Sequence, residues 1–129
     1  MKNFLTLFSA VCLAVAVLAA PAKIADISHA ELQAVVAKKS ATILDANGTD
    51  SFVTGHIPGA IDFTANEAKL AALLPKDKGA LIVAYCGNEL CSAYEDAAKA
   101  ALALGYTNVK HYAPGLDGWR KSGAKLEKS

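Results

Sequence analysis

The order of elements along the sequence predicts an α/β fold, a mostly parallel β-sheet with helices on both faces. Short apolar runs rich in β-branched residues alternate along the chain with stretches of helical periodicity. A helix between consecutive strands is the usual crossover of a parallel sheet. The 129 residues suffice for one domain, and 53% hydrophobic against 19% charged residues can fill its core.

The N-terminal segment has the three-part layout of a secretory signal peptide. Lys2 gives a positive start, residues 4–18 are almost wholly apolar, and Ala-Pro-Ala follows at residues 20–22. The apolar run is shorter than the roughly 20 residues that a membrane span needs. We therefore expect residues 1–22 to be removed, with cleavage after Ala19 as the alternative. The mature protein would be exported, periplasmic or secreted, and without a stable membrane anchor.

Removal of this segment leaves two cysteines. Cys12 lies inside the apolar run, whereas Cys86 and Cys91 remain in residues 23–129, which we expect to form the single domain. An even pair of cysteines in an exported protein is compatible with a disulfide, because oxidising compartments preserve such bonds.

The first half of the domain begins with a helix and a buried strand. Ser28 and Glu31 have capping-box spacing, and apolar residues at helical spacing predict a helix over residues 28–39. Residues 41–44 predict a strand. Residues 46–58 contain Gly and Pro with no sustained period, which indicates a loop.

The middle of the domain repeats this order. Residues 60–63 predict a second short strand, and residues 66–74 predict a helix that Pro75 closes. Residues 80–85, with Leu-Ile-Val at their centre, form the most strand-like run in the chain.

The last part completes the alternation. An alanine-rich helix is predicted over residues 92–104 and ends at Gly105 in the C′ position. A strand follows at residues 109–112, then a short helix through Trp119, which we expect to pack on the sheet. The tail from about Lys121 is polar, and we expect it to be frayed.

Cys86 lies where the strongest strand ends. The residues up to Ser92 must wrap from the strand end to a helix start, which turns backbone N–H groups inward beside the positive end of the helix dipole. A cysteine there should have a lowered pKa and react as a thiolate. The alternative is a half-buried cysteine that caps the sheet; the strand-to-helix switch, where ligands usually bind, favours function.

Four short motifs follow one another along the mature chain. An Asp at a strand end precedes Gly-His-Ile-Pro-Gly-Ala in residues 45–60, and Tyr-Cys opens a loop in residues 85–92. Residues 105–109 read Gly-Tyr-Thr-Asn-Val, and residues 114–119 read Pro-Gly-Leu-Asp-Gly-Trp. Together the motifs resemble the rhodanese-like domain family. The resemblance implies a three-layer fold around a sheet of about five strands.

The resemblance also implies sulfur transfer through a persulfide on Cys86. In that family the loop cysteine attacks the outer sulfur of a donor and passes that sulfur to a thiophilic acceptor. The implied partners are a small sulfur donor (polysulfide, persulfide or thiosulfate) and a thiol acceptor, which can be a protein. No cofactor and no metal ion is implied. The loop residues expected to hold the anionic sulfur through their backbone amides are Gly87, Asn88, Glu89, Leu90 and Ser92.

Two residues outside the loop are interpreted as loop supports. His56 is expected to brace the loop by hydrogen bonds in preference to acting as a base. Asp45, at its strand end, is expected to anchor the loop in preference to catalysing.

The loop departs from the family pattern in its charges. The family often carries a cation at the position of Cys91, and an Arg is usual at the position of Asn47. Glu89 adds a carboxylate that would repel thiosulfate by about 1 kcal/mol if exposed. We therefore expect poor use of thiosulfate. With acids and bases mixed along the chain and a formal net charge of +1, no nucleic-acid partner is expected.

Cys91 has three interpretations. It is a resolving thiol that attacks the Cys86 persulfide, an inert small residue, or half of a permanent structural disulfide. A disulfide requires the two Cα atoms to lie within about 7 Å, and we expect one that is easily reduced. Two function classes stay open: a sulfurtransferase, and a thiol–disulfide redox or non-catalytic binding module.

Overall fold

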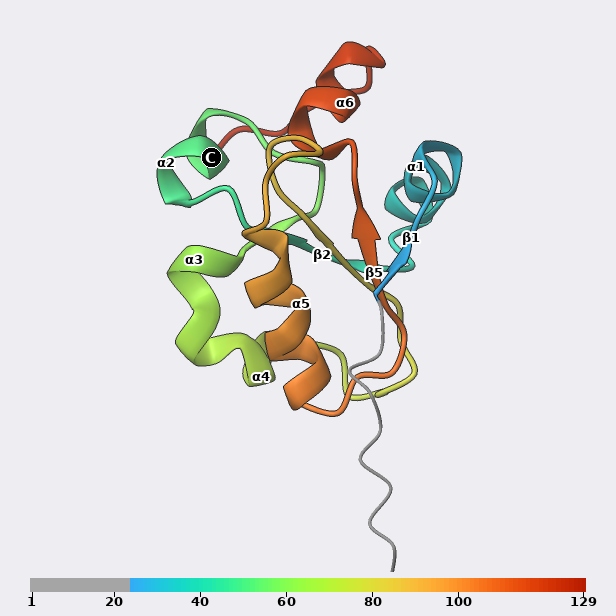
Figure 1. The fold of residues 1–129 in the computed structure, drawn as a ribbon, viewed down its shortest axis with the longest axis vertical. Helices are drawn as coiled ribbons and strands as arrows, with labels where there is room; N and C mark the ends of the chain where they lie inside the picture. The colour runs from blue at the N-terminus through green and yellow to red at the C-terminus, as the bar shows by residue number, and fades with distance from the viewer. Residues whose placement is uncertain (1–23) are drawn as a thin grey trace, which may run out of the picture.

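A five-stranded parallel sheet organises the protein (Figure 1). The computed structural model describes residues 24–129, so the predicted signal peptide and Cys12 lie outside the described residues. Every strand pair is parallel, and the order across the sheet is β1-β5-β4-β2-β3. The strands are β1 (Ala25–Asp26), β2 (Thr42–Asp45), β3 (Ile61–Asp62), β4 (Ile82–Tyr85) and β5 (Val109–Tyr112). The predicted fold class is confirmed.

Alternating side chains of the central strands build one core on each face of the sheet. In β4, all four residues are buried; Ile82 and Ala84 face one core, and Val83 and Tyr85 face the other. The first core is covered by α3 (Phe63–Asn66), α4 (Leu70–Leu73) and α5 (Tyr94–Ala103), and the second by α1 (His29–Lys38) and α6 (Gly115–Lys121), which gives three layers (Figure 1).

Local signals set several element ends where the sequence predicts them. The Ser28 side chain accepts from the Glu31 N–H, and the Glu31 carboxylate accepts from the Ser28 N–H, so the predicted capping box is formed. Gly105 follows α5 with φ 95°, in the left-handed region that the C′ position favours. β5 has the predicted bounds.

Other elements differ from the prediction. A short helix, α2 (Thr49–Thr54), lies in the predicted loop, and the predicted helix over residues 66–74 is broken into α3, a 3₁₀ turn (Glu67–Lys69) and α4. The edge strand β1 was not predicted, because two exposed residues carry no pattern of alternation. Its pairing with β5, through Lys110 and His111, exists only in the folded chain.

The predicted fraying of the C-terminal tail is wrong. Glu127 forms an antiparallel bridge with His56, and both backbone N–H···O bonds of this bridge measure 2.9 Å. The Trp119 indole N–H donates to the Lys125 carbonyl at 2.8 Å, and Leu126 packs against the second core. The tail is polar in composition, but a segment far away in the sequence supplies its backbone partners. Among residues 24–129 no helix has the length and apolar character that crossing a membrane requires.

Candidate active site

Cys86 follows the last residue of β4, the strand in the middle of the sheet. The carboxyl ends of all five parallel strands meet at this edge, which is where ligands usually bind in such sheets. The loop from Cys86 to Ala93 then leads to the first turn of α5. Cys86 is only 1% exposed, so the loop and its neighbours cover it.

Cys86 and Cys91 are joined by a disulfide. Their Cα atoms lie 6.1 Å apart, within the distance that such a bond can span. Cys91 is partly exposed, in contrast to Cys86. In this oxidised state Cys91 is not an inert residue. The two remaining interpretations of Cys91 are a resolving thiol and half of a structural disulfide.

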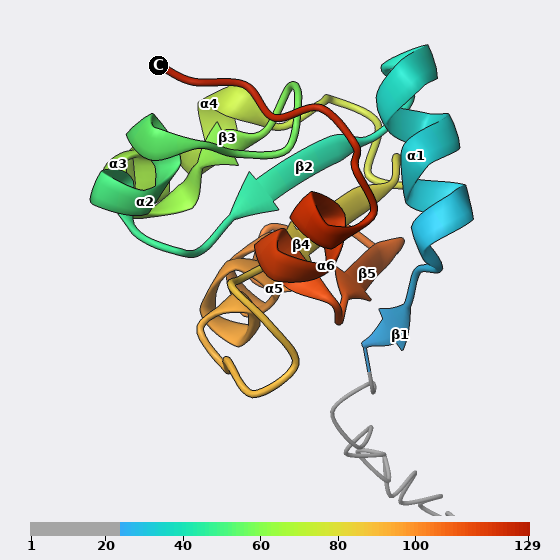
Figure 2. The same ribbon diagram turned by 90° about the horizontal axis from the view of Figure 1, so that it is seen from above.

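The first turn of α6 holds the start of the loop by its carbonyl groups. The N–H of Leu116 donates to the Cys86 carbonyl, and the N–H of Asp117 donates to the Gly87 carbonyl, each at 2.9 Å. Figure 2 shows α6 beside the loop that follows β4. This contact requires Gly115, because its φ is 64° and a Cβ atom there would lie 2.5 Å from the Cys86 carbonyl oxygen.

Several backbone N–H groups of the loop have no hydrogen-bond acceptor among the described residues. Within the described part of the chain, the N–H groups of Gly87, Asn88, Glu89 and Ser92 have no protein acceptor. In contrast, the N–H of Leu90 donates to the side chain of its neighbour Asn88 at 2.9 Å. The N-terminus of α5 also lacks a side-chain cap. Unpaired N–H groups of a curled loop are suited to an anionic sulfur.

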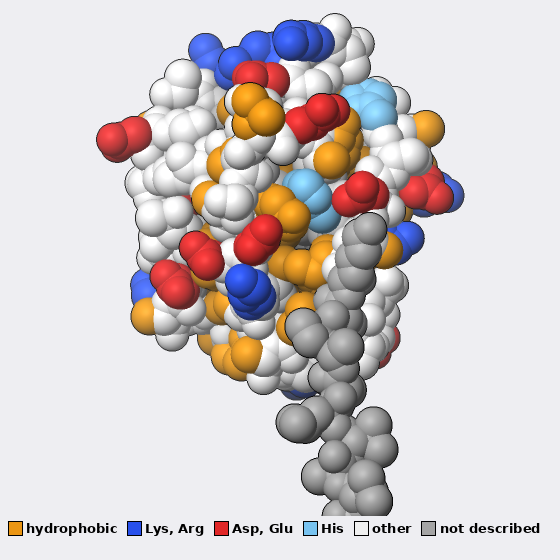
Figure 3. Space-filling model, in the orientation of Figure 1, with side chains coloured by type: hydrophobic (Ala, Val, Ile, Leu, Met, Phe, Trp, Pro, Cys, Tyr) orange, Lys and Arg blue, Asp and Glu red, His pale blue; other side chains and the backbone are white. Residues whose placement is uncertain are grey.

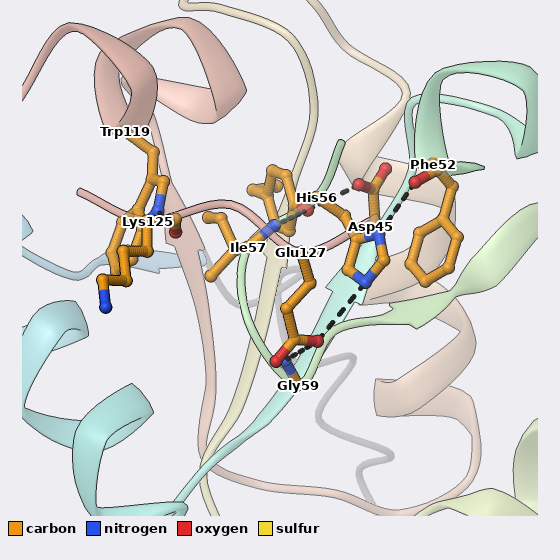
Figure 4. A network of polar contacts seen from close by, with 9 residues as sticks. Asp45, Phe52, His56, Ile57, Gly59, Trp119, Lys125 and Glu127 are labelled. Atoms are coloured by element: carbon orange, nitrogen blue, oxygen red, sulfur yellow. Dashed lines mark hydrogen bonds and ion pairs between the residues drawn. The ribbon is translucent and has the colours of Figure 1, made fainter. Parts of the chain in front are cut away.

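A buried network ties the base of the loop to two distant segments. The Tyr85 hydroxyl donates to the Asp45 carboxylate at 2.5 Å and accepts from the Ile57 N–H at 3.0 Å (Figure 4). The N–H of Asn47 also donates to Asp45, at 2.8 Å. Burial raises the pKa of Asp45 above its ordinary value, and the hydrogen bond from Tyr85 opposes that rise. Burial, then the Asp45 charge, raises the pKa of Tyr85, so the phenol stays protonated and donates.

The ring nitrogens of His56 face partners outside the loop that Cys86 begins. Its Nδ1 lies 2.7 Å from the Phe52 carbonyl, and its ring stacks on the Phe52 ring with centroids 3.7 Å apart. Its Nε2 lies 3.6 Å from the Glu127 carboxylate, which also accepts from the Gly59 N–H (Figure 4). Both ring nitrogens thus face partners outside the cysteine loop, an arrangement suited to bracing and unsuited to general base chemistry at Cys86.

An open hollow of about 530 Å³ borders the loop. Glu89 and Asp117 contribute carboxylates to it, and Lys121 from α6 contributes an ammonium group. Lys and Arg side chains gather over α6 at the top of the face in Figure 3, where α6 carries Arg120 and Lys121. The hollow is lined by Asn88, Glu89, Leu90, Pro114, Asp117, Gly118 and Lys121. The loop itself carries no Lys or Arg. Lys121 of α6 supplies one positive charge at the hollow, against the two negative charges of Glu89 and Asp117.

The family model of the rhodanese-like domain matches the chain over residues 28–122. The chain belongs to the rhodanese-like domain family.

Known proteins similar to this rhodanese-like chain include sulfurtransferases. A thiosulfate sulfurtransferase from Pseudomonas aeruginosa is 26% identical with a TM-score of 0.64, over 81% of this chain and 20% of that one. A human single-domain sulfurtransferase is 21% identical with a TM-score of 0.62, over 77% of this chain and 97% of that one. An HTH-type transcriptional regulator of Mycobacterium tuberculosis is 33% identical over 102 residues, 78% of this chain. The chain spans 44% of the length of that regulator.

In this rhodanese-like domain the predicted site residues fall into two groups. The loop group surrounds the disulfide, whereas Asp45 and His56 lie outside the loop; Asp45 is linked to the loop base through Tyr85, and His56 is linked to the C-terminal tail. The loop group is Cys86, Gly87, Asn88, Glu89, Leu90, Cys91 and Ser92. Their catalytic and binding roles stay predictions.

Sequence reasoning missed Tyr85 and Lys121. Tyr85 lies opposite Asp45 in the register of β2 and β4, and a buried Tyr beside the Cys carries a polar group that needs a partner. That signal was present in the sequence. Lys121 carried no such signal, because only the contact of α6 with the loop brings it to the hollow.

A further polar group lies at the start of the loop. The Asn47 side chain lies close to Gly87: a Cβ atom added to Gly87 would be 3.1 Å from the Asn47 side-chain oxygen. Its amide nitrogen is buried and has no hydrogen-bond partner among residues 24–129. Asn47 is the residue at the position where an Arg is usual in the family, and it supplies a polar group without a charge.

Proposed function

We propose that this chain is a sulfurtransferase that carries sulfur as a persulfide on Cys86. The observation that carries the proposal is the place of Cys86, at the carboxyl end of the central strand and at the start of a loop with unpaired N–H groups. A thiolate there is stabilised by those groups and by the N-terminal end of α5, which favours nucleophilic attack near neutral pH. Membership of a family whose solved relatives include sulfurtransferases supports the same reaction.

The reaction requires the reduced loop, because the nucleophile is a thiolate and Cys86 has none while it is bonded to Cys91. The Cys86 thiolate attacks the outer sulfur of the donor, the donor S–S bond breaks, and the donor remainder leaves with the bonding electron pair. The resulting persulfide is anionic, and the unpaired N–H groups stabilise it. A thiophilic acceptor then attacks the terminal sulfur and releases the Cys86 thiolate.

The charges around the hollow favour a donor with less negative charge than thiosulfate. Lys121 attracts an anion, but Glu89 and Asp117 repel it, and exposed or partly exposed charges of this kind are each worth about 1 kcal/mol or less. We propose a polysulfide or a protein persulfide as the donor and a thiol, on a small molecule or a protein, as the acceptor.

The disulfide favours a second candidate function. A thiol–disulfide redox module, or a binding module that has lost sulfur transfer, would also keep this fold and a Cys86–Cys91 bond. In such a module Cys86 would exchange disulfides or stay bonded, and would not carry a persulfide.

Intact-mass spectrometry distinguishes the two functions. The protein is reduced, freed of reductant, and exposed to polysulfide, with Cys86→Ser and Cys91→Ser as matched variants. We expect a gain of one sulfur atom in Cys91→Ser and none in Cys86→Ser. In the unmodified protein the gain should be transient if Cys91 resolves the persulfide. Absence of the adduct in Cys91→Ser, with the disulfide of the unmodified protein returning unchanged, would contradict sulfur transfer.

We also propose that the chain is exported. The signal-like segment and the disulfide both fit an oxidising compartment. N-terminal sequencing of the protein from a periplasmic or secreted fraction should begin at residue 23, or at residue 20 for the alternative cleavage. Recovery of the protein with its first residues intact from the cytoplasm alone would contradict export.

A further inference from the structure

The two cysteines of the disulfide differ in exposure. Cys86 is 1% exposed, and the start of α6 covers it through the bond from Leu116. Cys91 is partly exposed, and it directly follows Leu90, which is 96% exposed. The three residues at positions 88–90 line the open hollow. A reagent arriving from solvent therefore meets the Cys91 end of the bond.

We infer that an external thiol reduces this disulfide by attacking the sulfur of Cys91, with Cys86 as the leaving thiolate. The inference concerns how the site is opened, and it rests on the proposed function only for the use of the freed Cys86 thiolate. The hollow beside the loop is assigned as the approach for that thiol.

The geometry of thiol–disulfide exchange turns the difference in access into a difference in reactivity. The attacking sulfur approaches along the S–S axis, on the side opposite the sulfur that leaves. Attack on Cys91 therefore comes from the side away from Cys86. Attack on Cys86 would have to come through the protein that buries it. Access of this kind decides which sulfur is attacked.

The electrostatics favour the same direction. The better leaving group is the thiol of lower pKa, and Cys86 starts the loop whose N–H groups at Gly87 and Asn88 have no acceptor among the described residues. The α5 N-terminus adds its positive end, although Glu95 and Asp96 in its first turn offset part of that charge. The loop N–H groups therefore contribute most to the stabilisation of the Cys86 thiolate.

The chemistry balances with a thiol as the reductant. The first thiolate bonds to Cys91, the Cys86–Cys91 bond breaks, and Cys86 leaves with the electron pair. A second thiolate attacks the sulfur of the first, which forms the oxidised disulfide of the reductant and releases the Cys91 thiolate. Two electrons pass from two thiols to the loop. The thiols are two copies of a small molecule or the two cysteines of one protein dithiol.

Trapping the mixed disulfide tests the direction of attack. Oxidised full-length protein is mixed with glutathione, quenched with an alkylating reagent, and digested with a protease that cleaves after Glu. Cleavage after Glu89 separates the two cysteines onto different peptides. We expect glutathione on the Cys91 peptide and the alkyl group on the Cys86 peptide, at about tenfold or more over the reverse. Equal amounts, or an excess of glutathione on Cys86, would overturn the inference.

A charge series of small thiols tests the approach through the hollow. The three thiols are a cationic aminothiol, a neutral alcohol thiol and an anionic sulfonate thiol. After correction for thiol pKa, the rate of reduction should decrease in that order. The carboxylates of Glu89 and Asp117 should separate the two ends of the series roughly 3- to 10-fold. Glu89→Gln with Asp117→Asn leaves Lys121 as the remaining charge at the hollow and should remove or reverse this order, whereas Glu67→Gln, an exposed change on the 3₁₀ turn, should leave it intact. A series that the hollow variants do not alter would overturn the assigned approach.

A protein dithiol distinguishes the two sources of the reductant. A thioredoxin-type dithiol should reduce the loop without a lasting adduct, and its variant with one cysteine should remain attached to Cys91. Reduction by glutathione alone identifies a small thiol, and attachment of either reductant to Cys86 overturns the inference. Sulfur transfer is measured separately on protein that is already reduced. Its failure would contradict the proposed function and leave the direction of attack intact.

Discussion

Replacing Tyr85 by Phe removes one oxygen atom that serves two buried partners. The hydroxyl donates to the Asp45 carboxylate and accepts from the Ile57 N–H, and Tyr85 is fully buried. A hydrogen bond to a charged group contributes about 1.5–3 kcal/mol, and a buried N–H without a partner costs about 1–3 kcal/mol. Because the two terms share one atom, we expect Tyr85→Phe to lower the free energy of unfolding by about 3 kcal/mol.

The cost of this variant should depend on pH through Asp45. Burial already raises the pKa of that carboxyl, and loss of the donor raises it further. A protonated Asp45 no longer needs a donor, so the stability difference between the two proteins should be largest near neutral pH. The difference should shrink as the pH falls through the pKa of Asp45 in the variant.

Urea unfolding of the oxidised proteins measures this effect. Tyr112→Phe is the matched control, because Tyr112 pairs with Tyr85 in the sheet register and its hydroxyl has one hydrogen-bond partner among residues 24–129, His29, at 2.7 Å. The control should cost about 1 kcal/mol. If Tyr85→Phe costs no more than Tyr112→Phe, the shared hydroxyl does not stabilise the base of the loop, and the reasoning is wrong.

The other predictions concern the sheet edge, the contact of α6 with the loop, the hollow and the loop disulfide. Burial lowers the pKa of His111 from 6.5, so the unfolded chain binds its proton more readily; His111 should reduce stability as the pH falls below about 6.5, and His111→Gln should flatten that slope in urea titrations. Gly115→Ala should cost about 3 kcal/mol or prevent folding, whereas Gly123→Ala, with φ 80° and open space, should cost only about 1 kcal/mol in thermal unfolding. Turnover of thiosulfate should be weak, and Cys91→Arg with Glu89→Gly should raise it; saturable turnover at low thiosulfate in the unmodified protein would contradict this. The loop disulfide should have a reduction potential above about −300 mV. Because it closes a short loop, the protein should lose little thermal stability when the disulfide is reduced.

Much of the fold could be predicted because its signals are local. The buried strand β4 shows as a continuous apolar run, and α1 shows as a capping box followed by apolar residues at helical spacing. The position of Cys86 follows from the same reasoning, since a strand end and a helix start leave only a short loop between them. Each of these patterns depends on neighbours in the chain.

The parts that were missed depend on partners far away in the sequence. The tail became ordered through Glu127 and His56, which are 71 positions apart by their residue numbers. The edge strand β1 is defined by its pairing with β5. Neither segment has enough apolar pattern to be recognised alone, because backbone hydrogen bonds between segments leave no trace in side-chain periodicity.

The sequence by itself determined the strands β2 to β5, the helices α1, α5 and α6, the family motifs and the cysteine that begins the loop, because hydrophobic periodicity and short motifs act over a few residues. Only the tertiary structure decided what surrounds that cysteine. It joined Tyr85 to Asp45 and Ile57, brought Lys121 to the rim of the hollow, and buried Cys86 while leaving Cys91 partly exposed. These properties depend on distances between residues from different elements, and such distances arise only when the layers pack together.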